Sequence, residues 1–263
     1  MTLTPVLDVS GLSFCYEQTE VLRDVSFCVN KKEKLSIIGP NGAGKSTLIK
    51  LMIGILKKTS GSVSINGNKV EQYSRKELAR LLGYVPQANG GTFPFTVQQF
   101  VMMGRYPHLS PFTSPSEKDE SAVAEALDIT GTTGFAERNV STLSGGERQK
   151  VYVAAALAQG AKTLLLDEPA AFLDPKSQDE IHSTLTRVNR DGDVTIVAVT
   201  HDINIAAIWS DRVLALKNGR VVFNGEPVKL MNNETLKTIY DKDFLLMSHP
   251  KTGIPVTAPD LQT

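Results

Sequence analysis

The sequence lacks an excess of charge of either sign, because it contains 28 lysine and arginine residues and 28 aspartate and glutamate residues. A chain with no net positive field has no general attraction to nucleic acid or to anionic lipid. The charge balance therefore argues against a protein that acts on DNA or RNA through a large basic surface, although a local basic patch stays compatible with it.

Cysteines and long apolar runs are also scarce. Cys15 and Cys28 are the only cysteines and have no metal-ligand partners at the usual spacing, which predicts small buried side chains in a reducing compartment. The longest unbroken apolar run, Val151 to Ala158, is too short to span a bilayer. Residues 1–5 lack the basic and apolar regions of a signal peptide. We therefore expect a cytosolic protein that reaches a membrane only through a partner.

The most informative stretch is a glycine-rich loop between an apolar, strand-like run at 35–38 and a helix-like segment, with the sequence Gly39-Pro40-Asn41-Gly42-Ala43-Gly44-Lys45-Ser46. This spacing lets backbone N–H groups and the helix N-terminus point at phosphate oxygens. Lys45 would neutralise the β- and γ-phosphates, and the Ser46 hydroxyl would hold Mg²⁺. A purely structural turn would explain the glycines but not Lys45 and Ser46, so we predict a nucleotide-binding loop.

Periodicity places further elements around this loop. Alternating residues over 6–29 predict a β-rich opening, and Asn66-Gly67 and Asn218-Gly219 predict two tight hairpins. Residues from about 88 to 150 read as a helical insert, in which Ser114 and Glu117 form an expected capping box. The last segment, 248–263, contains three prolines and is expected to be extended.

Three further positions carry chemistry, each with a structural alternative. Tyr16 ends an expected strand and would either pack at an edge or lay its ring on a purine. Asp167 and Glu168 follow a buried apolar strand, so they form either a solvated turn or a pair that serves Mg²⁺ and an attacking water. Ser144 and Glu147 match a capping box, whereas the intervening Gly145-Gly146 would open that helix N-terminus to an anion.

Six motifs in this order resemble those of ABC-transporter ATPase subunits, and the resemblance covers almost the whole chain. The motifs are Gly39 to Ser46 (Walker A), Gln87 (Q-loop), Leu143 to Gln149 (signature), Leu166 to Pro169 (Walker B), Leu173-Asp174 (D-loop) and the switch histidine, His201. The resemblance implies an α/β fold: a P-loop NTPase (RecA-like) core with an antiparallel β subdomain and an α-helical subdomain. The whole chain, 1–263, would then be a single ABC ATPase domain.

The resemblance also implies a role for each motif residue, with ATP and Mg²⁺ as cofactors. Tyr16 would stack on adenine, Glu168 would polarise the water and His201 would contact the γ-phosphate. Phosphate contacts would come from Gly39, Pro40, Asn41, Gly42, Ala43, Gly44, Lys45, Ser46 and Thr47, and metal and water contacts from Ser46, Gln87 and Asp167. Ser144, Gly145 and Gly146 would act on the nucleotide of a second copy, so that a head-to-tail homodimer encloses each ATP.

A finer resemblance lies in the insert, where Gly104-Arg105-Tyr106-Pro107-His108, followed by Phe112, is similar to ATPases of iron-siderophore, haem and cobalamin importers. Importers of other metal-containing cargo, such as molybdate, share such a loop. Two departures from the family pattern, Ala170-Ala171-Phe172 before the D-loop and Glu147 in place of glutamine, remove no catalytic group. They put only the coupling between copies in doubt.

The leading interpretation is therefore an ATPase at the cytoplasmic face of a membrane. Its partners would be an integral-membrane permease and, indirectly, a substrate-binding protein, with no nucleic acid. The alternative from another class is a soluble ABC ATPase acting on ribosomes or DNA, which commonly carries two nucleotide domains or a long coiled-coil insertion that this chain lacks. A P-loop kinase is disfavoured by the signature motif. The sequence does not identify the cargo.

Overall fold

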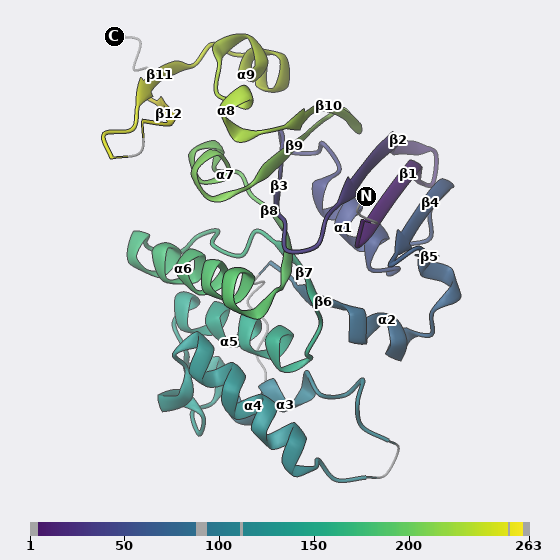
Figure 1. The fold of residues 1–263 in the computed structure, drawn as a ribbon, viewed down its shortest axis with the longest axis vertical. Coiled ribbons are helices and arrows are strands. Elements are labelled where there is room, and N and C mark those ends of the chain that lie inside the picture. Colours follow the sequence, from purple (N-terminus) through teal and green to yellow (C-terminus); the bar gives the residue numbers. More distant parts are fainter. Residues whose placement is uncertain (1–4, 88–93, 111–112, 252, 260–263) are drawn as a thin grey trace. The chain divides into compact units, whose positions relative to one another are not determined.

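The computed structural model describes residues 5–87, 94–110, 113–251 and 253–259, and Figure 1 labels their helices and strands. Phe112 and the expected start of the insert near residue 88 lie outside the described residues. The chain divides into two compact units: unit 1 comprises Met1–Gln72 and Val197–Thr263, and unit 2 comprises Tyr73–Ile196. No helix among the described residues is long and apolar enough to cross a membrane.

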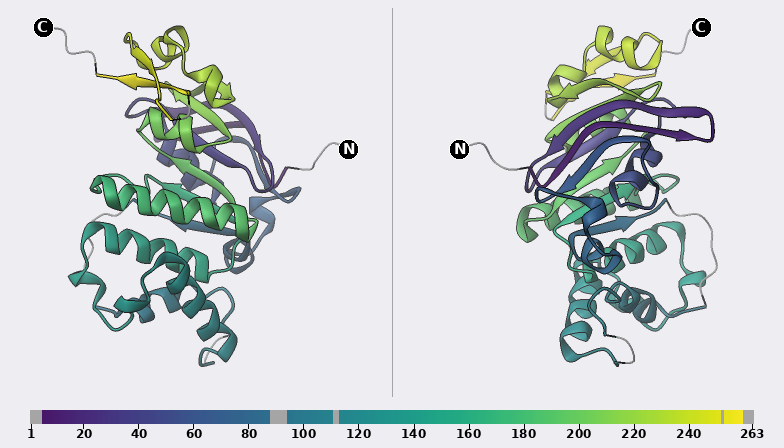
Figure 2. Two further views of the ribbon diagram at one scale, coloured as in Figure 1. Left: turned by 60° about the vertical axis from the view of Figure 1, so that its left-hand side comes forward. Right: turned by 90° about the vertical axis from the view of Figure 1, so that its right-hand side faces the viewer.

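Unit 1 opens with an antiparallel sheet in the order β2-β1-β4-β5. Its strands are β1 (Leu7–Tyr16), β2 (Thr19–Val29), β4 (Ser60–Ile65) and β5 (Asn68–Lys69). The two purple strands β1 and β2 run side by side as a long hairpin in both views of Figure 2. Alternate residues of β1 are buried, as period-two patterning predicts. The predicted β-rich opening is confirmed.

A second sheet in unit 1 carries the phosphate loop. Strand β3 (Lys34–Ile38) pairs in parallel with β9 (Arg212–Lys217), which pairs antiparallel with β10 (Arg220–Gly225). On its other side β3 neighbours β8 (Thr195–Val199), the strand within which the boundary between the units falls. The turn between β9 and β10 has positive φ at Asn218 (49°) and Gly219 (74°), so this predicted hairpin is confirmed.

The remaining elements of unit 1 are helices, one 3₁₀ turn and a small hairpin. They are α1 (Lys45–Met52), the 3₁₀ turn Val70–Gln72, α7 (Ile203–Trp209), α8 (Pro227–Leu230), α9 (Asn233–Tyr240), β11 (Leu245–Ser248) and β12 (Pro255–Ala258). Strand β12 lies within the segment 248–263 that was predicted to be an extended tail, and it pairs antiparallel with β11, which ends at Ser248. Asn204 of α7 accepts a hydrogen bond from the Thr257 N–H at 2.7 Å, which holds β12 against the unit.

Unit 2 combines two parallel strands with a helical core. Strand β6 (Leu82–Val85) pairs with β7 (Thr163–Asp167), all of whose residues are buried, as predicted. The helices are α2 (Arg75–Leu81), α3 (Val97–Met103), α4 (Glu117–Thr130), α5 (Gly145–Ala158) and α6 (Pro175–Gly192), with 3₁₀ turns at Thr133–Phe135 and Val140–Thr142. Helices α3, α4 and α5 share one apolar core, which includes Val101, Val123 and Val151. The boundary of a helical subdomain at about 88–150 stays a prediction.

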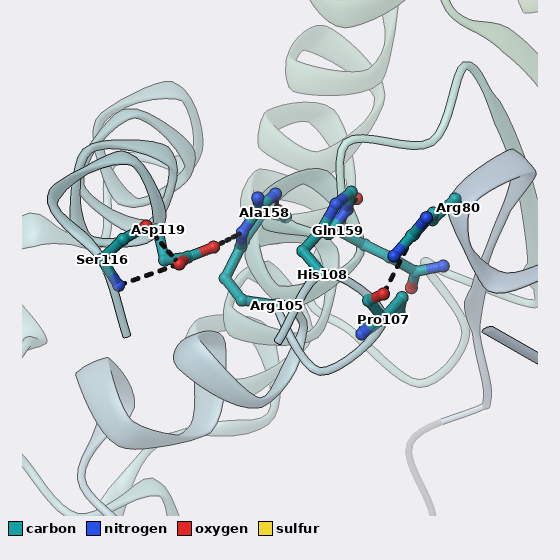
Figure 3. A network of polar contacts seen from close by, with 8 residues as sticks. All are labelled: Arg80, Arg105, Pro107, His108, Ser116, Asp119, Ala158 and Gln159. Carbon is teal, nitrogen blue, oxygen red and sulfur yellow. Dashed lines mark hydrogen bonds and ion pairs between the residues drawn. The ribbon is translucent and has the colours of Figure 1, made fainter. Parts of the chain in front are cut away.

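The predicted capping box of α4 is wrong by two residues. Ser116, and not Ser114, is the N-cap, and the Asp119 carboxylate accepts hydrogen bonds from the Ser116 N–H at 3.0 Å and the Ser116 hydroxyl at 2.6 Å. Arg105 donates to Asp119 at 2.9 Å and to the Ala158 carbonyl at 2.6 Å (Figure 3). Ser116 and Asp119 satisfy the same local capping-box spacing two residues further along the chain, and the buried Arg105 adds a charge-assisted hydrogen bond to Asp119.

Candidate functional site

The phosphate loop leaves the end of β3 and enters α1 at Lys45. Gly39, Gly42 and Gly44 have φ angles of 142°, 78° and 97°, a region that residues with a Cβ rarely adopt. A Cβ on Gly39 would lie 2.0 Å from the Leu216 carbonyl oxygen, and one on Gly44 would lie 2.6 Å from a Leu22 methyl group. The backbone of this loop is therefore fixed by contacts that only glycine permits.

Lys45 lies in this loop with its ammonium group folded back on the backbone. Its Nζ donates to the carbonyls of Gly39 at 2.7 Å and Pro40 at 3.0 Å, and the residue is 6% exposed. Helix α1 has Gly44 as its N-cap and no side-chain capping hydrogen bond. A helix N-terminus without a side-chain cap directs N–H donors outward, and the partial positive charge there favours an anion. The donor set of backbone N–H groups, one ammonium and the Ser46 and Thr47 hydroxyls fits a nucleoside triphosphate with Mg²⁺.

Two other predicted site residues belong to unit 1. Tyr16 ends β1, is 46% exposed, and packs edge-to-face on Phe14 with ring centroids 4.7 Å apart. Its ring is therefore anchored on one side and available on the other, which is compatible with both interpretations of this residue. His201 is exposed just after β8, and Asp202 next to it caps α7 by accepting from the Ile205 N–H at 2.9 Å.

The two predicted acids lie in unit 2, where β7 ends. Asp167 is buried, and Glu168 follows it with φ 53°, a strained conformation for a residue other than glycine. Gln87 donates from Nε2 to the Glu168 carboxylate at 2.9 Å, so two predicted site residues 81 positions apart are brought together. Burial, together with the negative charge of Asp167, raises the pKa of Tyr84 to about 12. The turn interpretation of these acids does not account for the Gln87 contact.

The signature stretch begins α5 with the predicted capping box, which is confirmed. The Ser144 hydroxyl accepts from the Glu147 N–H at 3.3 Å, and the Glu147 carboxylate accepts from the Ser144 N–H at 2.8 Å. That backbone hydrogen bond holds the pKa of Glu147 below its usual value. A Cβ on Gly146 would lie 2.5 Å from the Ser177 hydroxyl of α6, whereas Gly145 is less crowded. Gly146 thus has a packing role that the sequence did not reveal.

The motif from Gly104 to His108 follows the end of α3 and is held by contacts with α2 and with the end of α5 (Figure 3). Arg80 donates to the Pro107 carbonyl at 3.0 Å, and a His108 ring nitrogen lies 2.8 Å from the Gln159 carbonyl oxygen. A Cβ on Gly104 would lie 2.2 Å from the Ala155 carbonyl, so α3 ends in direct contact with α5.

Beside this motif lies a pocket of about 330 Å³ that the sequence did not predict. Its lining includes Gln87 of the candidate site and Gly104 of the motif, together with Tyr84, Phe100, Tyr152 and Gln159. The sequence contained both Gln87 and Gly104 but no signal that they share a cavity, because their approach depends on how α3 and α5 pack. The residue that contacts the candidate base therefore also lines a pocket whose wall includes three aromatic side chains.

Comparison with known proteins gives the class of this one. The family model described as ABC transporter matches residues 22–171. The chain therefore belongs to the ABC transporter family, as one of its ATP-hydrolysing subunits, and the predicted P-loop NTPase fold class is confirmed. The described roles of individual residues stay predictions.

Individual relatives and solved structures show which members of the family the chain is similar to. The chain is 37% identical over 250 residues to the iron(3+)-hydroxamate import ATP-binding protein FhuC of Bacillus subtilis (strain 168), covering 95% of this chain and 93% of FhuC. A solved ABC transporter in an inward-facing conformation matches with a TM-score of 0.86 and 29% identity, over 98% of this chain and 99% of that one. The dimeric ABC transporter cassette MJ0796 matches with a TM-score of 0.74 and 28% identity, over 84% of this chain and 98% of that one.

Proposed function

We propose that this protein is the ATP-hydrolysing subunit of a membrane importer whose cargo is an iron-siderophore complex, haem or cobalamin. The observation that carries the proposal is the position of Gln87, which donates to Glu168 and also lines the pocket beside Gly104. A side chain that contacts the candidate base and also lines a pocket can report the state of the nucleotide to a partner bound in that pocket. The similarity to an iron(3+)-hydroxamate import protein supports this cargo class over molybdate.

In this proposal each residue acts through its own chemistry. The phosphate loop and Lys45 hold the triphosphate, and Tyr16 packs on the adenine. Ser46, Gln87 and Asp167 would hold Mg²⁺, which would supply positive charge against the phosphates. Glu168 accepts a proton from the attacking water, a role that contributes roughly 10²- to 10⁴-fold to rate. His201 donates to the γ-phosphate.

A second copy of the chain completes the site by supplying Ser144, Gly145 and Gly146. Phe172, just before the D-loop, supports this arrangement because it is 93% exposed and is held at φ 61°. Leaving a large apolar side chain in water forgoes roughly 1.5–3 kcal/mol of burial free energy, so a protein surface is its expected partner. The dimeric state of the similar cassette is consistent with a homodimer.

The permease is the proposed occupant of the pocket, and it places this protein at the cytoplasmic face of the membrane. The pocket is lined in part by the aromatic side chains of Phe100 and Tyr152, whose ring centroids lie 5.3 Å apart with the ring planes inclined by 30°. Such a lining suits an apolar helical segment of a partner. A substrate-binding protein would deliver the cargo to the permease and would not touch this chain.

Replacement of Glu168 by glutamine tests the catalytic part. Glu168→Gln keeps the shape and the Gln87 neighbour but removes the base, so we expect ATP turnover to fall by at least about 100-fold with ATP binding retained. Glu226→Gln, at a surface ion pair with Lys229, is the matched control and should hydrolyse ATP normally. Near-normal turnover in Glu168→Gln would assign the base to another residue.

Purification of the tagged protein from its native membrane tests the transport part. We expect a permease to copurify, and uptake of radiolabelled iron(3+)-hydroxamate, haem or cobalamin to be lost in the Glu168→Gln strain. Copurification with no membrane protein, together with ATPase activity that nucleic acid stimulates in a salt-sensitive way, would favour the soluble ABC ATPase instead.

A further inference from the structure

The end of helix α9 packs against the strand that leads into the phosphate loop. Ile38, the last residue of β3, shares one buried apolar cluster with Leu236 and Ile239 of α9, and Tyr240 packs against the same cluster. Both elements belong to unit 1. Helix α9 therefore packs in the same cluster as the residue that directly precedes Gly39, the first residue of the phosphate loop.

Strand β9 links the same two elements through consecutive residues. The carbonyl of Leu216 is the group that a Cβ on Gly39 would meet at 2.0 Å. The next residue, Lys217, donates from Nζ to the Thr238 carbonyl and to the Asp241 carboxylate, each at 2.7 Å. One side of β9 therefore contacts the first glycine of the loop while its end anchors the C-terminus of α9.

Tyr240 carries a polar group that the proposed mechanism does not use. Its hydroxyl is buried and makes no hydrogen bond of normal geometry within the described part of the chain. Burial raises the pKa of Tyr240 to about 12, and the backbone of Gly39 acts on that pKa in the opposite direction, so Gly39 faces the hydroxyl. A buried hydroxyl without a partner is destabilising, and a small shift of the loop would satisfy this one.

We propose that Tyr240 is a positioning residue for the phosphate loop: its hydroxyl completes a hydrogen bond with the Gly39 backbone when the loop closes on a nucleoside triphosphate. This inference rests on the proposed function. The bond reaches normal geometry only in the loaded loop, so it adds to nucleotide affinity and contributes little to the stability of the empty protein. Helix α9 is thereby coupled to the occupancy of the loop.

Tyr240→Phe tests the inference because it removes the hydroxyl and keeps the ring. We expect the melting temperature of the nucleotide-free protein to stay the same or rise. The dissociation constant for Mg-ATP should increase about three- to tenfold, as the loss of one hydrogen bond predicts. The KM for ATP should rise with it while kcat at saturating ATP changes little. Tyr106→Phe, at an exposed tyrosine, is the control and should change neither quantity.

The outcomes separate this inference from the proposed function. An unchanged ATP dissociation constant in Tyr240→Phe, with the wild type binding and hydrolysing ATP, would overturn the role of Tyr240 alone. A wild type that neither binds nor hydrolyses ATP would overturn the proposed function. Lys217→Ala provides a second measurement: the anchor is lost but the hydroxyl stays, so the Tyr240→Phe effect on ATP affinity should shrink in the double variant.

Discussion

Two glycine-rich helix N-termini in this protein are built in opposite ways. Helix α1 begins after Gly44, which is in the left-handed conformation and provides no side-chain cap. Helix α5 begins after Ser144, which forms a reciprocal capping box with Glu147. The first N-terminus leaves its donors without a side-chain acceptor, while the second satisfies two of its own.

The difference separates two ways of using a helix start. At α1 the missing acceptor must come from outside, and a phosphate oxygen supplies it together with negative charge that the helix dipole favours. At α5 a carboxylate already accepts from the N-cap N–H, so the exposed part of the motif is Ser144 and Gly145, whereas Gly146 is buried against α6. We therefore expect the first loop to bind nucleotide in a single copy and the second to act only between copies.

The largest effect is expected from a substitution at the N-terminus of α1. Gly44→Ala would place a Cβ 2.6 Å from Leu22 at φ 97°, so the loop must deform, and we expect ATP binding to be lost or to weaken more than tenfold. Gly67→Ala is the matched control, since Gly67 has a φ of 83° in a hairpin with no atom within 4 Å of the added Cβ. It should cost stability but bind ATP normally. Calorimetric titration distinguishes them, and equal binding by both variants would refute the argument.

A smaller effect is expected at the second terminus. Ser144→Ala removes a cap worth about 1 kcal/mol and removes the hydroxyl that a second copy would use. Its melting temperature should fall by about 2–4 °C, ATP binding to the single copy should persist, and ATP turnover should drop. Ser116→Ala removes the N-cap residue of α4 and serves as the control for stability. If both variants lose turnover equally, Ser144 contributes only its cap.

The smallest expected effect is on the pH dependence of stability. It concerns the N-terminus of a third helix, α4, where Asp119 is the acid of the capping box. The Ser116 hydroxyl and N–H, with Arg105, hold the pKa of Asp119 well below its usual range. A carboxyl group with a lowered folded-state pKa stabilises the fold above its unfolded pKa of about 3.9, and this contribution is lost as the pH falls through the folded value.

Asp119→Asn should therefore lower the urea midpoint at pH 7 and reduce the loss of stability between pH 5 and pH 3, with ATP affinity unchanged. Asp243→Asn, at an exposed acid that pairs with Lys237, is the control and should have a smaller effect. An ATP affinity that follows the Asp119 titration would contradict the assignment of this network to folding alone.

Features that depend on near neighbours in the chain were predictable. The phosphate loop, the Ser144 and Glu147 capping box, the buried strand before Asp167 and the Asn-Gly hairpins all express constraints that act over a few residues. The capping box expected at Ser114 was wrong because the same Ser-x-x-acid spacing occurs again at Ser116 and Asp119, and the pattern alone does not say which serine begins the helix. The pocket beside Gln87 was not predictable, since it depends on the packing of α3 and α5.

The sequence by itself therefore determined the chemistry of this protein: a phosphate loop, two acids, a signature helix start and their order along the chain. Only the tertiary structure decided which groups meet, such as Gln87 with Glu168, Gly146 with Ser177, and Tyr240 with the start of the phosphate loop. The physical reason is the separation along the sequence over which each interaction acts. Backbone conformation and capping are set within one turn of chain, whereas burial and close approach depend on elements far apart in the sequence.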